Sequence, residues 1–304
     1  MDPIPIIVNP AAGGGRALRR ARAAVSAFAE RGRAVELRRT DGPGHAGEIA
    51  AACAVAGRPA VVACGGDGTV HEAAAGLAGT GTALAVLACG RGNDFAAALR
   101  LPRGPGELVT AVLEGERIRV DLGSLNGTAF CTVAAVGFDA EVTRHVMRGG
   151  GRTAGRHAYL LGALQLLFRY PAPVLRFEGD FGVREGRYLL GAIANTERYG
   201  AGFRIAPGAR ADDGLLDCVL VSDLPRWRAL RLIPSIFRGA HLRHPEVEVV
   251  RTRELRVTSE GPCALAADGE FLGETPATIS VRPRALWLCR VSAAGADRRP
   301  RPTA

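Results

Sequence analysis

Three glycine-rich segments of this 304-residue chain have the composition of phosphate-binding turns. Residues 8–16 read VNPAAGGGR, residues 64–72 read CGGDGTVHE, and residues 89–95 read CGRGNDF. Each follows a short apolar run and precedes an alanine-rich stretch, as expected where a strand leads into a helix. Glycines let the backbone approach a polyphosphate closely, and the N–H groups at a helix start can receive it. These segments therefore predict the binding or transfer of phosphate.

The middle segment carries the sharpest prediction, because Asp67 places a carboxylate where Mg²⁺ would bridge bound phosphates. A tight Asp-Gly turn without function is the alternative. Its expected place at the carboxyl edge of a parallel sheet, where such sheets bind ligands, favours binding. The first segment matches neither the GxGxxG nor the Walker pattern, so a plain strand-to-helix connection is an equal alternative there. In the third segment, Asn93 or Asp94 could cap the following helix and also lie beside the Asp67 turn.

Two further turns carry carboxylates. Asp212 and Asp213 are adjacent, and they could hold a divalent cation with help from carbonyl oxygens. Spacing alone favours a plain hairpin turn at that place. Glu270 follows Asp268-Gly269 between two strand-like runs, so a hairpin could present it as a general base toward a substrate hydroxyl. The same Asp-Gly-Glu sequence also suits a purely structural hairpin.

The first part of the chain must position the glycine-rich turns, and it repeats strand and helix. This repetition is typical of an α/β nucleotide-binding domain with a mostly parallel sheet covered by helices. The predicted strands are residues 4–8, 34–37, 60–63 and 83–87, and the predicted helices lie near 18–28, 46–56, 69–78 and 106–114.

After about residue 123 strand-like runs follow one another with few helices between them. This pattern predicts a β-rich second domain, an antiparallel sandwich or a split barrel. We expect residues 1–123 to form the first domain, completed by 285–292, residues 124–284 the second, and 293–304 a disordered tail. The predicted strands are 130–136, 174–177, 188–194, 216–221, 247–250, 255–257, 278–281 and 285–291, and the helices lie around 155–169 and 226–238.

Composition excludes several classes of protein. All 39 basic residues are arginine, which give a net charge of +9, but they are dispersed without interleaved aromatics, which argues against nucleic-acid binding. The seven cysteines form no CxxC pair, so free buried thiols are expected. No apolar run approaches the roughly 20 residues that span a bilayer. The N-terminal residues lack the features of a signal peptide, so the expected location is cytoplasmic, and a peripheral position at the membrane surface stays open.

Taken in order, these segments resemble the bacterial diacylglycerol/lipid kinase family, whose catalytic core is shared with eukaryotic diacylglycerol, sphingosine and ceramide kinases. The resemblance covers roughly residues 4–291. It rests on six motifs: Asn9-Pro10 with its glycine turn, Gly-Gly-Asp-Gly-Thr-x-x-Glu at 65–72, Gly-x-Gly-Asn-Asp-Phe-Ala at 90–96, Asp121-Leu122-Gly123, Tyr-Gly-x-Gly to Asp-Asp-Gly-Leu-Leu-Asp at 199–217, and Asp-Gly-Glu at 268–270.

The resemblance implies an ATP- and Mg²⁺-dependent kinase that phosphorylates a lipid hydroxyl, with diacylglycerol as the default acceptor. It implies that ATP binds in a cleft between the domains, that Asp67 organises the catalytic Mg²⁺ and phosphates, and that Glu270 deprotonates the acceptor. A second Mg²⁺ would be held by Asp213 with the backbone carbonyls of Arg210 and Leu215. The residues expected at the nucleotide are Asn9, Thr40, Gly65, Gly66, Asp67, Gly68, Thr69, Val70, His71, Arg91, Asn93 and Asp94.

Arg91 departs from the family pattern, which usually has threonine there, and it could donate to a phosphate instead. Two alternatives stay open: a soluble small-molecule kinase of the NAD kinase type, and a non-catalytic lipid- or nucleotide-binding relative. The apolar stretch 158–168, between Arg156 and Arg169, could line a lipid entrance, rest on the membrane or belong to the core. Edge strands of the second domain could pair in a homodimer.

Overall fold

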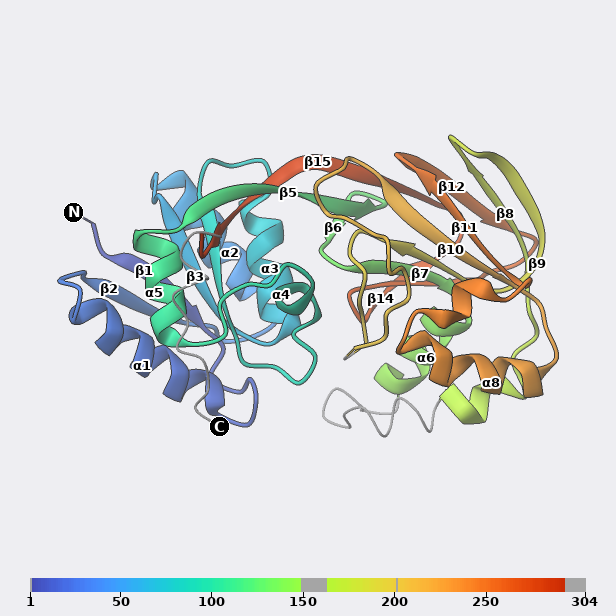
Figure 1. Ribbon diagram of the computed structural model, residues 1–304, viewed down its shortest axis with the longest axis horizontal. Helices are drawn as coiled ribbons and strands as arrows, with labels where there is room; N and C mark the ends of the chain where they lie inside the picture. Colours follow the sequence, from blue (N-terminus) through green and yellow to red (C-terminus); the bar gives the residue numbers. More distant parts are fainter. Residues whose placement is uncertain (1, 149–162, 201, 293–304) are drawn as a thin grey trace. The chain divides into compact units, whose positions relative to one another are not determined.

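The computed structural model describes residues 2–148, 163–200 and 202–292 (Figure 1). The chain divides into two compact units, the first made of residues 1–120 and 284–304 and the second of Asp121–Pro283. The tail expected over 293–304 lies outside the described residues, as does the first part of the stretch 158–168, of which residues 163–167 are helical. No helix among the described residues is both long and apolar enough to cross a membrane.

Unit 1 is built on a parallel sheet with the strand order β2-β1-β3-β4-β15, in which β15 spans Ala277–Arg290. Residue pairs such as Ile6 with Val62 and Val62 with Ala85 set its register. The predicted α/β class with a mostly parallel sheet is therefore confirmed. The elements are β1 (Ile4–Val8), α1 (Arg16–Ala29), β2 (Val35–Arg39), α2 (His45–Val55), β3 (Ala60–Gly65), α3 (Asp67–Leu77), β4 (Ala83–Ala88), α4 (Asp94–Ala98) and α5 (Pro105–Leu113).

Helices cover both faces of this sheet, and its inner strands β1, β3 and β4 are apolar, whereas β2 at the edge also carries Glu36, Arg38 and Arg39. On one face, Phe28 of α1 is fully buried in a cluster with alternate residues of β1, β3 and β4. On the other, α2 and α3 pack so closely that a Cβ on Gly76 would lie 2.3 Å from the carbonyl oxygen of Gly47. The sheet is therefore a rigid base for the loops at its carboxyl edge.

Unit 2 is antiparallel and sandwich-like, as predicted. Residues 182–187 of the long strand β9 pair with β8, and residues 188–194 pair with β7 and β10, so β9 belongs to both sheets. The strands are β6 (Thr128–Phe130), β7 (Val133–Gly137), β8 (Val174–Gly179), β9 (Gly182–Ala194), β10 (Leu216–Ser222), β11 (Val247–Thr252), β12 (Glu254–Ser259), β13 (Ala264–Ala267) and β14 (Glu270–Glu274), and the helices are α6 (Phe138–Arg148), α8 (Arg226–Ile236) and the 3₁₀ helix η2 (Ala240–Arg243).

The side chains that alternate along the strands of unit 2 fill two cores. Phe177, Ile193 and Leu220 lie in the core between the sheets. Val219, the neighbour of Leu220, points the other way and packs against Ala229 of α8. One sheet therefore carries α8 on its outer face, and α6 lies on the same sheet through Ala140.

Two long strands, β5 (Glu116–Leu125) and β15 (Ala277–Arg290), each contain a boundary between the units and pair with each other. The separate strands predicted at 278–281 and 285–291 are in fact one continuous strand, β15, in which Arg284 adopts a positive φ of 53° beside Pro283. Trp287 of β15 pairs in parallel with Ala83 of β4.

The single strand predicted at 130–136 was wrong, because it is divided into β6 and β7. The backbone amides of Cys131 and Thr132 donate to the carboxylate of Asp268, at 2.6 and 2.8 Å. These amides are therefore taken out of the strand ladder at the position where the strand is interrupted.

Candidate functional site

In unit 1 the three glycine-rich segments follow β1, β3 and β4, whose carboxyl ends share one edge of the parallel sheet. Asn9 follows β1, and its amide nitrogen Nδ2 donates to Oγ1 of Thr69 at 3.3 Å. Thr40 follows β2, and its backbone N–H donates to the carbonyl of Val8 at 2.9 Å. The structure therefore brings Asn9, Thr40 and the segment after β3 together, as the sequence predicts.

Asp67 joins the second and third segments. Its Oδ2 accepts a hydrogen bond from the backbone N–H of Asn93 at 2.8 Å, and its Oδ1 accepts one from the N–H of Asp94 at 2.9 Å. Asn93 takes a left-handed φ of 54°, and its side chain closes the turn with both backbone groups of Gly90 at 2.8 and 3.1 Å. The carboxylate is thus fixed in orientation at the first turn of α3, beside the start of α4.

One glycine in each segment stands at a contact too close for a side chain. A Cβ on Gly90 would lie 2.8 Å from the Cα of Gly66, and a Cβ on Gly65 would lie 2.5 Å from Oγ1 of Thr69. A Cβ on Gly13, which has a φ of 62°, would lie 2.3 Å from the carbonyl oxygen of Cys89. The contacts of Gly90 with Gly66 and of Gly13 with Cys89 therefore bring the backbones of the three segments together.

We expect Gly90→Ala to lower the free energy of unfolding by about 1–3 kcal/mol, because the added methyl group would meet backbone rather than a movable side chain. Urea unfolding measures this change. Gly106→Ala, in the first turn of α5, is the control, since its added Cβ would have no atom within 4 Å. Equal stability of the two variants would contradict the close approach of the two loops.

The remaining predicted nucleotide residues differ in how they can act. Val70 and His71 are buried, at 4% and 8% exposure, so Val70 can offer a ligand only its backbone. Arg91 is exposed, and no hydrogen bond or ion pair of its side chain is recorded with the described residues. Glu72, the last residue of the motif, accepts a hydrogen bond from the backbone N–H of Ala46 at 3.1 Å and so supports the start of α2.

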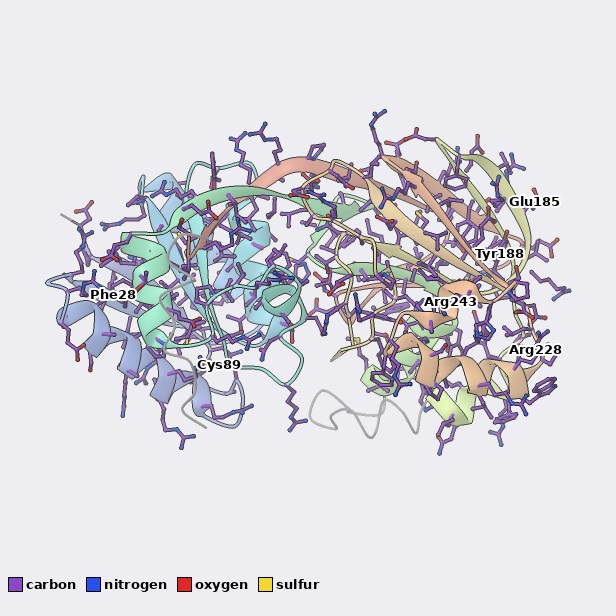
Figure 2. All side chains as sticks on the ribbon, viewed as in Figure 1. Phe28, Cys89, Glu185, Tyr188, Arg228 and Arg243 are labelled. Atoms are coloured by element: carbon purple, nitrogen blue, oxygen red, sulfur yellow. The ribbon has the colours of Figure 1, made fainter. Side chains whose placement is uncertain are left out.

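Two buried cysteines stand directly before the second and third segments. The Sγ atoms of Cys64 and Cys89 are 3.7 Å apart (Figure 2 labels Cys89). The hydrogen bond with Cys89, together with burial, raises the pKa of the Cys64 thiol. The same hydrogen bond lowers the pKa of Cys89 to about 7 against the opposing effect of burial, and the charge of Arg20 adds to the lowering. The described cysteines are all free thiols, as predicted.

In unit 2 the predicted base, Glu270, begins β14 immediately after a tight hairpin turn. Asp268 and Gly269 have φ values of 49° and 81°, and Ala267 pairs with Glu270 across the turn. Positive φ at both central residues is typical of a type I′ hairpin. The carboxylate of Asp268 also accepts a hydrogen bond from Oγ1 of Thr132 at 2.5 Å, besides those from the two backbone amides. Asp268, to which the sequence assigned no role of its own, therefore fixes the turn that presents Glu270.

The predicted second metal site lies in the turn before β10. Oδ1 of Asp213 accepts a hydrogen bond from the N–H of Leu215 at 3.1 Å. The side chain of Arg210 pairs with Asp212 at 3.0 Å, so it is the backbone carbonyl of Arg210 that would contact a cation. Buried Asp121, of the Asp-Leu-Gly motif, accepts a hydrogen bond from the N–H of Gly214 at 2.8 Å. The described residues contain no group of three or more acidic, histidine or cysteine side chains that could hold a metal, so any ion here depends on carbonyl oxygens.

Asp217, at the end of the same motif, has a structural role. Its Oδ1 accepts a hydrogen bond from Nε of Arg251 at 2.9 Å, and the same arginine lies 4.0 Å from Oδ2 of Asp213. Burial raises the pKa of Asp217, while Arg251 opposes the shift. The motif therefore anchors the turn to β11.

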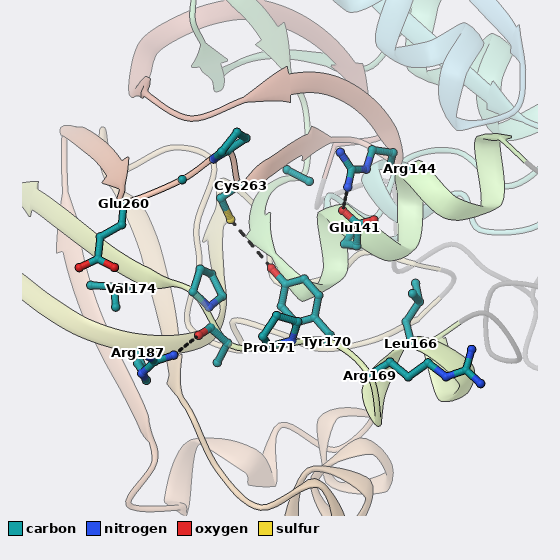
Figure 3. A pocket seen from close by; sticks show the side chains of 15 residues that line it. Glu141, Arg144, Leu166, Arg169, Tyr170, Pro171, Val174, Arg187, Glu260 and Cys263 are labelled. Carbon is teal, nitrogen blue, oxygen red and sulfur yellow. Dashed lines mark hydrogen bonds and ion pairs between the residues drawn. The ribbon is translucent and has the colours of Figure 1, made fainter.

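A pocket of about 490 Å³ also lies in unit 2, between α6 and residues 166–174 (Figure 3). Tyr170 points across it to Cys263, with its hydroxyl oxygen 3.9 Å from the sulfur, and burial raises the pKa of Tyr170. Arg144 on its wall pairs with Glu141 and with Glu274. None of the residues predicted for nucleotide, metal or base lines this pocket.

Comparison with known proteins agrees with the two units. Residues 3–125 match the family model described as the diacylglycerol kinase catalytic domain. Residues 132–290 match the one described as the YegS C-terminal NAD kinase beta sandwich-like domain.

Relatives that match over most of the chain have names of the same family. A protein named diacylglycerol kinase from Mycobacterium tuberculosis is 36% identical over 297 residues, which cover 94% of each chain. A protein of Pseudomonas aeruginosa named "Probable lipid kinase YegS-like" is 37% identical over 278 residues and 87% of each chain. The crystal structure of a diacylglycerol kinase from Bacillus anthracis strain Sterne covers 96% of this chain and 98% of its own, with a TM-score of 0.70 at 20% identity, which shows the fold. The chain therefore belongs to the bacterial diacylglycerol and lipid kinase family.

Proposed function

We propose that this lipid kinase transfers the γ-phosphoryl group of ATP, with Mg²⁺, to the hydroxyl group of a lipid of the diacylglycerol type. The observation that carries the proposal is the Asp67 carboxylate, held by the backbone amides of Asn93 and Asp94. Phosphoryl transfer depends on positioning and on charge neutralisation rather than on covalent chemistry by the protein. A carboxylate fixed beside bare glycine backbone suits that requirement.

In this proposal the phosphates of ATP bind over the three segments that follow β1, β3 and β4. The N-cap of α3 is Gly66, whose lack of a side chain leaves the N–H groups of the first turn for a ligand. The exposed guanidinium of Arg91 takes the place of the usual threonine as a charged donor to phosphate. Asn9, Thr40 and Thr69 contact the nucleotide around them.

The residues present fit a magnesium ion at Asp67. Each carboxylate oxygen accepts one backbone hydrogen bond, so the group is fixed in orientation, and carboxylate oxygens are ligands that Mg²⁺ takes in proteins. When bound, Mg²⁺ would neutralise charge on the phosphate oxygens. A second ion would be held by Asp213 and the carbonyls of Arg210 and Leu215, where the turn is already tied by its own hydrogen bonds.

Glu270 is the proposed general base toward the lipid hydroxyl. It stands at the first position of β14, and the Asp268 turn before it holds its backbone in place. A carboxylate on a rigid hairpin can accept the hydroxyl proton as the new phosphate ester bond forms.

The direct test is transfer of labelled γ-phosphate from ATP to a panel of acceptors. We expect label in diacylglycerol dispersed in micelles or vesicles, only when Mg²⁺ is present. The panel should include a sphingoid base, phosphatidylglycerol and NAD. Label in NAD without any label in lipid would overturn the lipid assignment, and binding of ATP without transfer to any acceptor would point to a non-catalytic relative.

A further inference from the structure

The outward face of α8 combines an aromatic ring with arginines. Trp227 is 55% exposed, the largest exposed aromatic ring of that helix. The guanidinium groups of Arg231 and Arg228 lie 4.9 and 6.0 Å from the centre of its ring. Exposed Pro234 follows Arg231 at the spacing that places residues on one side of a helix, and exposed Arg238 comes just after α8 ends. We call Trp227, Arg228, Arg231, Pro234 and Arg238 the α8 face; Figure 2 labels Arg228 on it.

This face is not needed to hold α8 in place. The opposite side of the helix packs through Ala229 and Leu232, at 5% and 7% exposure, into a core that includes Val219 and Leu189. Packing therefore accounts for the inner residues and leaves an indole ring in water. Tryptophan is enriched at interfaces and in membrane-boundary belts, where one end of the ring is apolar and the other is wet.

The charge around the α8 face is one-sided. Residues 224–245 contain five arginines and no aspartate or glutamate. Two of the arginines are neutralised by neighbouring residues, Arg226 by Asp223 at 2.9 Å and Arg228 by Glu246 at 2.5 Å. For Arg231, Arg238 and Arg243 no ion pair is recorded among the described residues. The surface thus offers uncompensated positive charge beside an apolar ring.

A second exposed aromatic side chain lies on the segment next to α8. Leu167 is buried in the same core as Ala229, and Nη2 of Arg226 donates to the carbonyl of Tyr170 at 2.7 Å. Phe168 lies between Leu167 and Tyr170 in the chain. It is 62% exposed, and Arg169 beside it is exposed as well. The combination of aromatic ring and arginine therefore occurs on both segments.

We propose that the α8 face docks on the surface of an anionic phospholipid bilayer. Tryptophan favours the boundary between headgroups and acyl chains, where its ring is apolar and its N–H stays polar. Arginines on the same face would meet lipid phosphates, and the absence of carboxylates over 22 residues complements a negative surface. A nucleic acid would not favour the apolar Pro234 between the arginines. The inference rests on the proposed function, because a kinase whose acceptor is a lipid meets that lipid in a bilayer.

Sedimentation of the full chain with vesicles tests the proposal. We expect binding to vesicles that contain phosphatidylglycerol and not to pure phosphatidylcholine, with a loss of binding at high salt. Each arginine near an anionic surface contributes roughly fivefold to partitioning, so Arg231→Glu with Arg238→Glu should weaken it at least about tenfold. Trp227→Ala should weaken it as well.

The matched control is Arg253→Glu with Arg256→Glu, which makes the same change in net charge at two exposed positions of unit 2 away from α8. The control should bind as the wild type does. Equal binding by the two double variants would overturn the proposal, and so would equal binding to both kinds of vesicle. Loss of oligonucleotide binding in the α8 variant with vesicle binding unchanged would also overturn it.

Fluorescence gives an independent readout, because the chain has two tryptophans. In Trp287→Phe only Trp227 remains, and its emission should shift to the blue with phosphatidylglycerol vesicles. An unchanged spectrum would contradict insertion of the ring. Phosphoryl transfer to short-chain diacylglycerol in detergent micelles separates the two proposals, since the α8 variants should keep that activity. If the wild type docks through α8 but labels no lipid, the proposed function fails and the docking surface stands.

Discussion

Asp67→Asn is expected to lower kcat by about 10²–10³-fold or more, measured at saturating ATP, Mg²⁺ and lipid. The substitution keeps the shape of the side chain but removes the charge that we propose for holding Mg²⁺. It also turns an amide N–H toward the backbone N–H of Asn93 or Asp94, where the wild type has an acceptor. Replacing one such hydrogen bond by a contact between two donors should cost about 1–3 kcal/mol of stability.

The two effects of Asp67→Asn can be measured separately. Urea unfolding reports the stability, and single-turnover transfer at a temperature where the variant is folded reports the chemistry. Asp2→Asn is the control, since it removes a carboxylate of unit 1 that is 75% exposed and pairs with Arg58 at the surface. That change should leave activity unaltered and stability within about 1 kcal/mol. Wild-type kcat in the folded Asp67→Asn protein would contradict the proposed site.

Glu270→Gln is expected to lower kcat by about 10²–10⁴-fold with little change in KM for ATP, because a general base acts on the acceptor rather than on the nucleotide. The hydrogen bonds of Asp268 that hold the turn before β14 are left in place by this change.

Two companion variants make the result specific to Glu270. Glu274→Gln, four residues further along β14, removes a carboxylate that pairs with Arg144 and should keep near wild-type activity. Asp268→Asn leaves Glu270 in place but weakens the hydrogen bonds to Cys131 and Thr132, and it should lower kcat less than Glu270→Gln does. Full activity of Glu270→Gln, or an equal loss in Glu274→Gln, would refute the assignment of the base.

The parallel sheet of unit 1 could be predicted closely, for a physical reason. Its strands β1, β3 and β4 are covered on both faces, so each of them is a continuous apolar run, and residues 4–8 were predicted with the bounds that β1 has. Strand β5 gives no such signal, because Glu116, Arg117 and Arg119 alternate with apolar residues along it. Helix α6 was missed because its sequence is as polar as a loop, with only three buried residues.

The sequence indicated which segments of the candidate site lie together, but not the hydrogen bonds that join them. The spacing of the motifs indicated that the segments after β3 and β4 lie together, but not that Asp67 would bind two backbone amides of the next loop. The role of Asp268 depends on Cys131 and Thr132, 137 and 136 residues earlier in the chain. No local pattern encodes a contact of that range, and the strand break at 131–132 was missed for the same reason.

The course of β15 has a consequence for how the protein is made. Strand β4 is the fourth of the parallel strands to leave the ribosome, yet its neighbour on one side, Trp287–Leu288 of β15, is synthesised about two hundred residues later. Until then β4 presents an unpaired edge, and such edges invite pairing with other chains. We infer that the nascent protein is most prone to aggregate during this interval. The contacts of unit 1 that can form only after β15 is synthesised include the hydrogen bond from the N–H of Gly79 to the carbonyl of Ala285, at 2.7 Å, and the ion pair of Arg290 with Glu116.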